Sequence, residues 1–300
     1  MTTGTNIRPL RPGQRARLLV GDVDGGPPRL VHESAVSAIE APNWSPDGRW
    51  LVYNHDGLLY RVAADGSGAP EPIDTGGITD ANNDHVLSPD GATVYLSAGD
   101  GHIHAVPFTG GEPRRVTNDH VPGPFRHFLH GVSPDGSTLA YVGVEPFEGD
   151  EWGYRNVFTI PAAGGADVRL TDSPAPADGP EYSPDGEWIY FNSEHGSRVA
   201  GHAQIFRMRP DGSGLEQLTF DERVNWFPHL SPDERHVLYV SFPPGTLGHP
   251  ADVDVVLRVM GPAGEEPRDV VELFGGQGTL NVNSWAPDSR RFAYVEYPLA

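Results

Sequence analysis

A short pattern recurs six times along this chain and constrains its fold more than any other feature of the sequence. In each copy a large apolar residue precedes a Ser-Pro-Asp turn, and a run of alternating β-branched and aromatic residues follows, as in WSPDGRWLVY from Trp44. The serine positions are 45, 88, 133, 183, 231 and 286, with alanine at the last. A turn followed by such alternation predicts a β-strand, and regular spacing over the whole chain predicts a repeat architecture.

A second turn, rich in glycine, recurs out of phase with the first. It lies in residues 22–26, 63–68, 107–112, 161–166, 209–214 and 261–266. Each repeat therefore predicts four antiparallel strands, and four such strands at this period form one blade of a β-propeller. The expected blades cover residues 41–77, 82–118, 127–172, 178–220 and 226–272.

The two ends of the chain predict how the ring closes. Residues 280–298 contain only the first two strands of a repeat, whereas residues 15–33 contain only the last two. Pairing between them completes a sixth blade and removes an exposed sheet edge. The sequence thus predicts an all-β, six-bladed β-propeller over residues 1–300, a single domain with residues 1–14 as an N-terminal tail.

The composition excludes several classes of partner and of chemistry. The chain carries 41 acidic and 21 basic residues, a formal net charge of −20. Phosphate binding depends mostly on cationic groups, so we expect no nucleic-acid partner and no anionic membrane surface as a partner. Cysteine is absent, which excludes disulfides and thiol catalysis. The first residues carry no secretory signal, so we expect a cytoplasmic protein.

The SPDG repeats, with tryptophan or another large apolar residue before the serine, resemble the six-bladed propeller domain of TolB-type proteins. The resemblance covers residues 16–297. It implies the fold and leaves the function open, because unrelated activities share this scaffold. TolB carries an additional N-terminal α/β domain for which this chain has no room, so a role in the Tol envelope system is not expected.

The two faces of the predicted ring differ. One face, the turn face, carries only the short SPD-type and glycine turns. We interpret the aspartates of the SPD-type turns as turn caps; they are Asp47, Asp90, Asp135, Asp185, Asp233 and Asp288. The opposite face, the loop face, carries longer polar and aromatic loops, among them residues 144–156, 192–204 and 242–254. Long loops on a rigid ring predict a ligand site on this face.

Polar residues stand where the innermost strand of each blade begins, shortly before the SPD-type turn. They are Asn43, Asp84, His85, His130, Glu181, His229 and Asn283. Glu181 and His229 lie two residues before the serine, whereas His85 and His130 lie three before it. A one-residue step in a strand turns the side chain to the other face. Two interpretations stay open: convergence on one ligand, or separate hydrogen bonds to the neighbouring blade.

Under the first interpretation these groups suit either a divalent metal or a general base with polar partners. The predicted catalytic residues are His85, His130 and His229. The predicted substrate-binding residues are Asn83, Asp84, Arg126, Arg155, Trp226, Asn281 and Asn283. The predicted ligands of one divalent metal, Mn, Zn or Ca, are His85, His130, Glu181, His229 and Gln277.

A second, weaker resemblance concerns oligogalacturonate lyases, TolB-like propellers in which three histidines and a glutamine hold manganese. His229 in NWFPHLSPD and Gln277 in GGQGTLNVNSW stand where such ligands fall. This chain has Asn281 and Asn283 where that family has two histidines, so His85 and His130 would take their place. The resemblance implies β-elimination on a uronate-like sugar, with the metal offsetting the carboxylate charge and a histidine removing the proton.

Two functions follow. The first is binding of a polar, carbohydrate-like small molecule on the loop face, with divalent-metal-assisted lyase or hydrolase chemistry as its catalytic form. The alternative is a non-catalytic, TolB-like scaffold that binds a protein partner. The first is favoured because imidazole, carboxylate and amide groups collect near the axis, whereas protein docking surfaces are rich in exposed apolar and aromatic groups.

Overall fold

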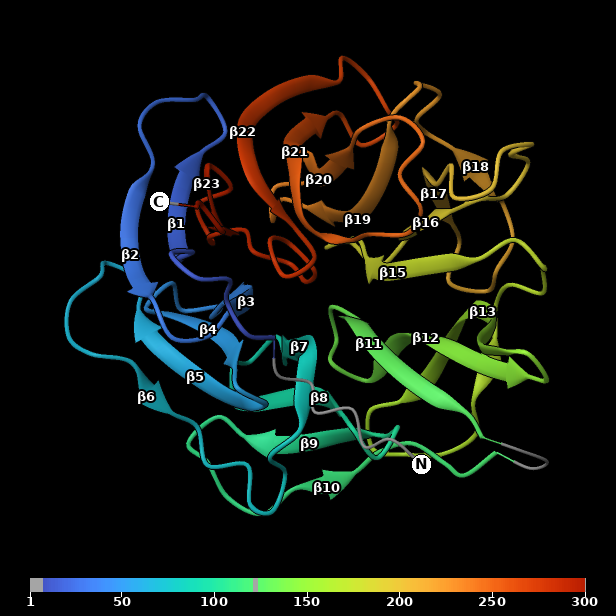
Figure 1. Cartoon of the computed structure of the whole chain (residues 1–300). Helices are drawn as coiled ribbons and strands as arrows, with labels where there is room; N and C mark the ends of the chain where they lie inside the picture. Colours follow the sequence, from blue (N-terminus) through green and yellow to red (C-terminus); the bar gives the residue numbers. More distant parts are fainter. Residues whose placement is uncertain (1–7, 121–123, 300) are drawn as a thin grey trace.

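The chain forms a ring of six β-sheets around a central axis, as predicted, in a computed structural model that describes residues 8–120 and 124–299 (Figure 1). In five of the sheets the four strands follow one another from the axis outwards in chain order. Blade 1 contains β3 (Ile39–Trp44), β4 (Trp50–His55), β5 (Leu58–Ala63) and β6 (Glu71–Pro72). Blade 2 contains β7 (Ala81–Leu87), β8 (Thr93–Ala98), β9 (Ile103–Pro107) and β10 (Arg114–Arg115).

The next three blades repeat this order. Blade 3 contains β11 (Arg126–Val132), β12 (Thr138–Phe147), β13 (Asp150–Pro161) and β14 (Val168–Arg169). Blade 4 contains β15 (Ala177–Tyr182), β16 (Ile189–Ser193), β17 (Gln204–Met208) and β18 (Glu216–Gln217). Blade 5 contains β19 (Val224–Leu230), β20 (Val237–Phe242), β21 (Ala251–Met260) and β22 (Arg268–Gly276). No helix within the described residues is long and apolar enough to cross a membrane.

Blade 6 closes the ring with strands from both ends of the chain. It contains β1 (Ala16–Asp22), β2 (Arg29–Ser34) and β23 (Arg291–Glu296). β1 pairs antiparallel with β23 and with β2, which confirms the predicted closure. The expected innermost strand is reduced to one bridge, Trp285 with Phe292. Within this segment the Asn283 Oδ1 accepts the Trp285 N–H at 3.0 Å.

The described part of the N-terminal tail lies against blades 5 and 6. The Arg8 guanidinium pairs with Asp252 at 2.9 Å and lies over the Tyr297 ring at 4.1 Å. Gln14 Nε2 donates to the same Asp252 carboxylate at 2.6 Å. Residues 1–7 of the predicted tail lie outside the described residues.

The SPD-type turns cap themselves, as predicted. In the first copy Ser45 Oγ donates to Asp47 Oδ1 at 2.6 Å, and this carboxylate also accepts the Arg49 N–H at 3.0 Å. The Trp50 N–H donates to Ser45 Oγ at 2.9 Å, so the same pair starts the second strand. In the last copy Asp288 accepts the Arg290 N–H without a serine partner.

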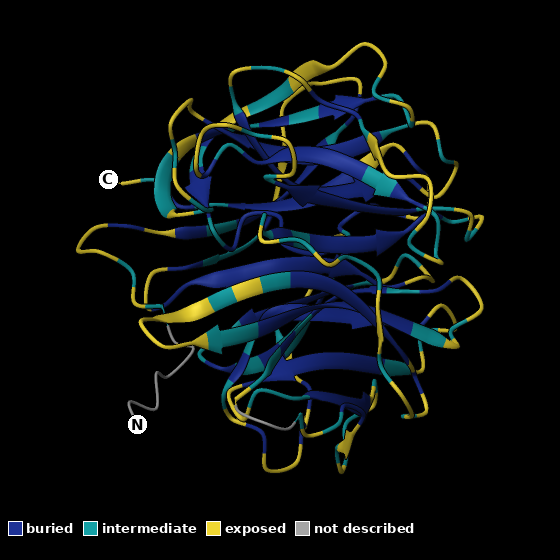
Figure 2. Ribbon diagram, turned by 90° about the vertical axis from the view of Figure 1, so that its right-hand side faces the viewer, coloured by how far each residue is buried: buried dark blue, intermediate teal, exposed yellow. Residues whose placement is uncertain are grey.

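The apolar core lies between neighbouring blades, where the strands are buried, while the connections at the rim are exposed (Figure 2). Val52 and Leu59 of blade 1 pack with Val94 and Leu96 of blade 2, all four fully buried. Burial of one such side chain contributes roughly 2 kcal/mol. Each blade therefore buries apolar side chains against the next.

Each complete inner strand contains a register shift shortly before its SPD-type turn. In blades 1, 4 and 5 the residue four positions before the serine has a positive φ, and a proline follows it. These residues are Ala41 (φ 53°), Gly179 (φ 62°) and Phe227 (φ 54°). The bulge sets the direction of the side chains that follow, which a regular strand would alternate.

Two of those side chains hold the next blade. Asn43 Oδ1 accepts the Leu87 N–H of blade 2 at 3.0 Å, and its Nδ2 donates to the Asn283 carbonyl at 2.6 Å. Glu181 Oε1 accepts the Leu230 N–H of blade 5 at 3.1 Å. For Asn43 and Glu181 the structure therefore confirms the interpretation of hydrogen bonds to the neighbouring blade.

The Asn43→Ala variant tests this contact between blades. The change leaves a buried N–H and a buried C=O without partners, so we expect the free energy of unfolding to fall by about 2 kcal/mol or more. Denaturant unfolding followed by tryptophan fluorescence measures it. Asp65→Ala, which removes a cap from an exposed turn, is the control and should cost less. An equal decrease in the free energy of unfolding in both variants would contradict the role assigned to Asn43.

Candidate functional site

A polar pocket of about 330 Å³ lies where blades 2, 3 and 4 approach one another on the loop face. β7, β11, β12, β13, β15 and β19 contribute to its wall, and the loops that carry His249 and Gln277 complete it. Its lining comprises Asn82, Asn83, Asp84, Phe128, His130, Val142, Val144, Trp152, Arg155, Asp178, Phe227, Gly248, His249, Gln277 and Asn281. The ring thus brings four blades and the connection between β22 and β23 to a single concavity.

The His130 ring lies between two carboxylates in the wall of this pocket. Its Nε2 is 3.2 Å from Asp178 Oδ1 and 3.9 Å from Asp84 Oδ1. Its Nδ1 donates to the Asn281 carbonyl at 3.1 Å. Asn82 Nδ2 donates to Asp84 Oδ2 at 2.6 Å and orients that carboxylate. Three blades therefore supply one buried hydrogen-bonded ionic group.

The charges of this group follow from the geometry. Burial alone disfavours the His130 imidazolium, but Asp84 and Asp178 together outweigh it and raise the pKa of His130 to about 9. Burial raises the pKa of Asp84 to about 6 despite the nearby imidazolium. Burial also acts against the charged form of Asp178, yet the hydrogen bond from His130 holds its pKa below the ordinary value. At neutral pH His130 is a cation, and Asp84 titrates close to that pH.

The bulge in β11 gives His130 its position. Leu129 pairs with Tyr141 and Gly131 with Ala140, so His130 is the extra residue between two sheet pairs. Its ring stacks on Phe227 of blade 5, with centroids 5.6 Å apart. The ring is therefore fixed both by hydrogen bonds and by an aromatic neighbour.

The opposite wall is made of loop residues that hold one another. His249 Nδ1 and Gln277 Oε1 form a hydrogen bond, and Asn281 Nδ2 donates to the same oxygen at 3.2 Å. Burial lowers the pKa of His249, so this ring is neutral at neutral pH. The Arg8 guanidinium donates to the Gln277 carbonyl at 2.7 Å, so the N-terminal tail supports the wall.

Six of the predicted site residues line the pocket: Asn83, Asp84, His130, Arg155, Gln277 and Asn281. Arg155 Nε is buried and has no hydrogen-bond partner, so a donor remains for a ligand.

The other predicted residues lie elsewhere. His85 is fully buried with Nε2 3.5 Å from the Val52 carbonyl, and burial lowers its pKa to about 4. Trp226 is 2% exposed and packs on the His249 ring behind the wall, with centroids 4.4 Å apart. The Arg126 guanidinium lies outside the lining, 5.9 Å from the centre of the Trp152 ring.

Glu181, His229 and Asn283 meet one another on the other side of His130. Glu181 Oε2 pairs with His229 Nδ1 at 2.5 Å, and Glu181 Oε1 accepts from Asn283 Nδ2 at 2.6 Å. Glu181 and Asn283 line a second, smaller cavity of about 180 Å³ that includes Pro46 and Pro89 of the SPD-type turns. His130 lines both cavities and separates these residues from the pocket on the loop face.

The five residues predicted to bind a metal do not come together. Glu181 and His229 are bonded to each other, His85 faces a carbonyl, and the Gln277 oxygen already accepts two hydrogen bonds. Within the described residues, the one group of three His, Asp or Glu ligand atoms within 4.8 Å of one another contains none of the five.

The sequence analysis did not single out Asp178 or His249. Asp178 stands five residues before its serine, at the start of β15, and the register shift in that strand brings it level with His130. His249 lies in the long connection between β20 and β21. The signal for both was present, since each is a titratable residue in a loop-face connection, but the spacing rule looked only two to four residues before the serine.

The fold and this pocket define a six-bladed β-propeller with a polar cavity near its axis. Residues 130–249 match the TolB beta propeller domain family. The chain is 43% identical to uncharacterized protein Atu1656 of Agrobacterium fabrum over 262 aligned residues. The alignment covers 86% of this chain and 84% of that protein. It is 39% identical to the solved "putative TolB" of Agrobacterium tumefaciens, with a TM-score of 0.86 over 96% of this chain and 99% of that one. The chain belongs to the TolB-like β-propeller family.

A solved oligogalacturonate lyase in complex with manganese shares the fold alone. It is 14% identical, with a TM-score of 0.55 over 89% of this chain and 74% of that one. The resemblance to TolB-type propellers expected from the SPDG repeats is confirmed, and the weaker resemblance to the lyases extends to the architecture.

The charge of His130 predicts how stability depends on pH. Its pKa in the folded state, about 9, lies above the ordinary value of 6.5, so the native protein holds an extra proton between these values. The extra proton contributes roughly 3 kcal/mol to the free energy of unfolding. This contribution is complete below pH 6.5 and is lost as the pH rises through 9. Asp178→Asn should lower the pKa of His130 and remove at least half of this contribution. The difference in free energy of unfolding between the wild type and the variant, measured with denaturant at pH 6 and at pH 9, shows it.

Asp100→Asn is the matched control, because Asp100 belongs to another Asp–His pair, with His104 Nε2 at 2.9 Å, away from the pocket. It should keep the pH dependence of the wild type. A pH dependence of Asp178→Asn equal to that of the wild type would contradict the charge assigned to His130.

Proposed function

We propose that this protein binds a small, polar, carbohydrate-like molecule in the pocket on the loop face. The proposal is carried by one observation: Asp84, His130 and Asp178 meet in the wall of a concave site of about 330 Å³. Buried ionisable groups with displaced pKa values in such a site are typical of ligand and active sites. The volume is near the lower end for small-molecule pockets, so the ligand is small.

The lining favours a sugar. Phe128, Trp152 and Phe227 offer aromatic faces, and Phe128 and Trp152 stack with centroids 5.9 Å apart. Aromatic rings suit the apolar faces of sugar rings, whereas the amides of Gln277 and Asn281 suit hydroxyl groups. Trp152 is 47% exposed and stands at the entrance, where a ligand can reach it.

The charges favour a sugar that carries a carboxylate. The His130 imidazolium is already paired with Asp84 and Asp178, whereas Arg155, the other cation in the lining, has a buried Nε without a partner. A carboxylate on the ligand would pair with the guanidinium and restore the donor's hydrogen bond. The manganese complex among the distant structural relatives is named as an oligogalacturonate lyase, which supports the same ligand class.

Asp84 is the group placed to move a proton. With a pKa of about 6 it is mostly a carboxylate at neutral pH and still basic enough to accept a proton from bound substrate. In β-elimination from a bound oligouronate, Asp84 would take the proton beside the carboxylate, the glycosidic C–O bond at the next carbon would break as the C=C bond forms, and the leaving oxygen would take a proton from water. The developing negative charge would be stabilised by Arg155 and His130. Since the predicted metal ligands do not converge, this chemistry is assigned to side chains alone.

Binding of galacturonate, glucuronate and neutral galactose by isothermal calorimetry tests the ligand class. We expect the uronates to bind at least tenfold more tightly than galactose, and Arg155→Met to remove that preference, because it removes the cation. Arg198→Met is the matched control, an exposed arginine in the connection between β16 and β17. Equal affinities in the two variants, or no binding to the wild type, would contradict the proposal.

Asp84→Asn separates binding from proton transfer. The substitution preserves the size of the side chain and removes the base, so we expect uronate affinity to change less than threefold. Elimination from a galacturonate oligomer, followed by ultraviolet absorbance of the new double bond, should fall at least a hundredfold. Binding without any elimination in the wild type would restrict the function to ligand capture.

One observation supports the alternative of a protein-interaction scaffold. Phe147 and Tyr154, 51% and 48% exposed, stand together near the end of the β12–β13 hairpin, with ring centroids 5.3 Å apart. Exposed aromatic groups are frequent in protein interfaces. Phe147→Ser leaves the lining of the pocket intact, so a partner lost in this variant would assign the hairpin to docking without affecting the sugar site.

A further inference from the structure

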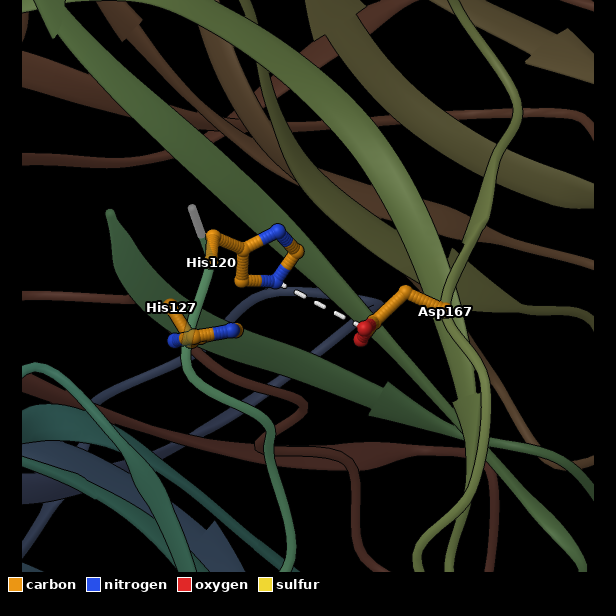
Figure 3. A group of neighbouring side chains, drawn as sticks. All are labelled: His120, His127 and Asp167. Atoms are coloured by element: carbon orange, nitrogen blue, oxygen red, sulfur yellow. Dashed lines mark ion pairs between the residues drawn. The ribbon is translucent and has the colours of Figure 1, made fainter. Parts of the chain in front are cut away.

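A second group of ligand-type side chains lies between blades 2 and 3, outside the pocket. His120 follows β10, His127 is the second residue of β11, and Asp167 precedes β14 (Figure 3). One ligand atom from each lies within 4.8 Å of the other two. The three side chains point toward one another from three separate segments (Figure 3).

The His127 ring is held with one nitrogen free. Its Nδ1 donates to the Gly101 carbonyl of blade 2 at 2.7 Å, which places the proton on Nδ1 and leaves the Nε2 lone pair available. The residue is 1% exposed, and its Nε2 is buried without a hydrogen-bond partner. A buried acceptor without a partner is costly, and a carbonyl behind the opposite nitrogen is the usual support of a metal-binding histidine.

Asp167 and His120 are oriented in the same way. The Tyr141 hydroxyl donates to Asp167 Oδ1 at 2.7 Å, and Asn118 Nδ2 donates to Oδ2 at 2.8 Å. The His120 ring stacks on Phe125 with centroids 3.8 Å apart. His120 Nε2 is buried, forms no hydrogen bond, and lies 3.5 Å from Asp167 Oδ2.

The packing beside the group is close and depends on a glycine. Gly143 of β12 pairs with His127 of β11, and a side chain at this position would meet Phe125 at 2.4 Å and Phe158 at 2.6 Å. A larger residue would displace the ring on which His120 stacks.

We propose that His120 Nε2, His127 Nε2 and Asp167 form a site for one Zn²⁺ ion that joins blade 2 to blade 3. Two imidazole nitrogens and one carboxylate are a set that Zn²⁺ accepts, with a water at the fourth tetrahedral position. Ligand atoms of such a site are roughly 3.3 Å apart, close to the 3.5 Å between His120 Nε2 and Asp167 Oδ2. The site is independent of the sugar pocket, since none of its residues lines that pocket.

Zinc binding to the full chain, purified without a polyhistidine tag and stripped with EDTA, tests the proposal. After reloading and dialysis we expect one Zn²⁺ per chain by elemental analysis, and a melting temperature that rises with zinc. Co²⁺ in place of zinc should give the intense visible absorption of a tetrahedral site. Competition with a chromophoric chelator should show at least tenfold weaker zinc binding in His120→Ala and in Asp167→Asn.

His195→Ala is the control for adventitious binding to an exposed histidine and should bind zinc like the wild type. His120 is the most exposed ligand, at 28% of its side chain, so its loss should leave the fold intact, as melting curves without metal will show. Less than one-tenth of an equivalent of zinc on the wild type would overturn the proposal. So would an affinity in both ligand variants equal to that of His195→Ala.

Discussion

The pairing of β1 with β23 closes the ring and thereby fixes the distances between blades. The contacts between inner strands and the pocket near the axis depend on these distances. The pairing runs from Arg17 with Glu296 to Asp22 with Arg291, so the two ends of the chain act as neighbouring strands of one sheet. Six sheets that bury their faces against one another have little freedom to separate. Side chains such as Asn43 and Glu181 then hold the inner strands by bonding the backbone of the next blade. Groups far apart in sequence are thereby held at hydrogen-bonding distance near the axis.

The pocket uses this rigidity to hold charges that would separate in a looser fold. His130 stays protonated because carboxylates from the blades on either side approach it, and neither comes from its own sheet. The cost of burying these groups is offset only while the three remain together. The same principle applies at the boundary of blades 2 and 3, where His127 depends on a carbonyl of the preceding blade for its orientation. Both sites are therefore properties of the assembled ring.

The number of blades, their order and the closure were predictable because each follows from a local signal: the SPD turn, the glycine turn and the alternating strand. The polar residues near the axis were predictable as a set, but their grouping was not. Position 130 and position 85 have the same spacing from the serine, yet the bulge in β11 brings His130 to the pocket, while His85 of β7 pairs with Leu96 of β8 and is buried. Bulges follow from backbone geometry and packing. The proline after Ala41, Gly179 and Phe227 marks three of them in the sequence.

The central claim is that ring closure brings Asp84 and Asp178 close enough to keep the imidazole of His130 charged. Nitrogen-15 NMR of histidine-labelled protein at pH 7.5, with His130 assigned by substitution, tests it most directly, because the ring nitrogen shifts distinguish imidazolium from either neutral tautomer. We predict that both nitrogens of His130 carry protons at this pH, whereas buried His85 and His127 each carry a proton on one ring nitrogen only. A neutral His130 ring would contradict the arrangement of charges from which the binding site is inferred.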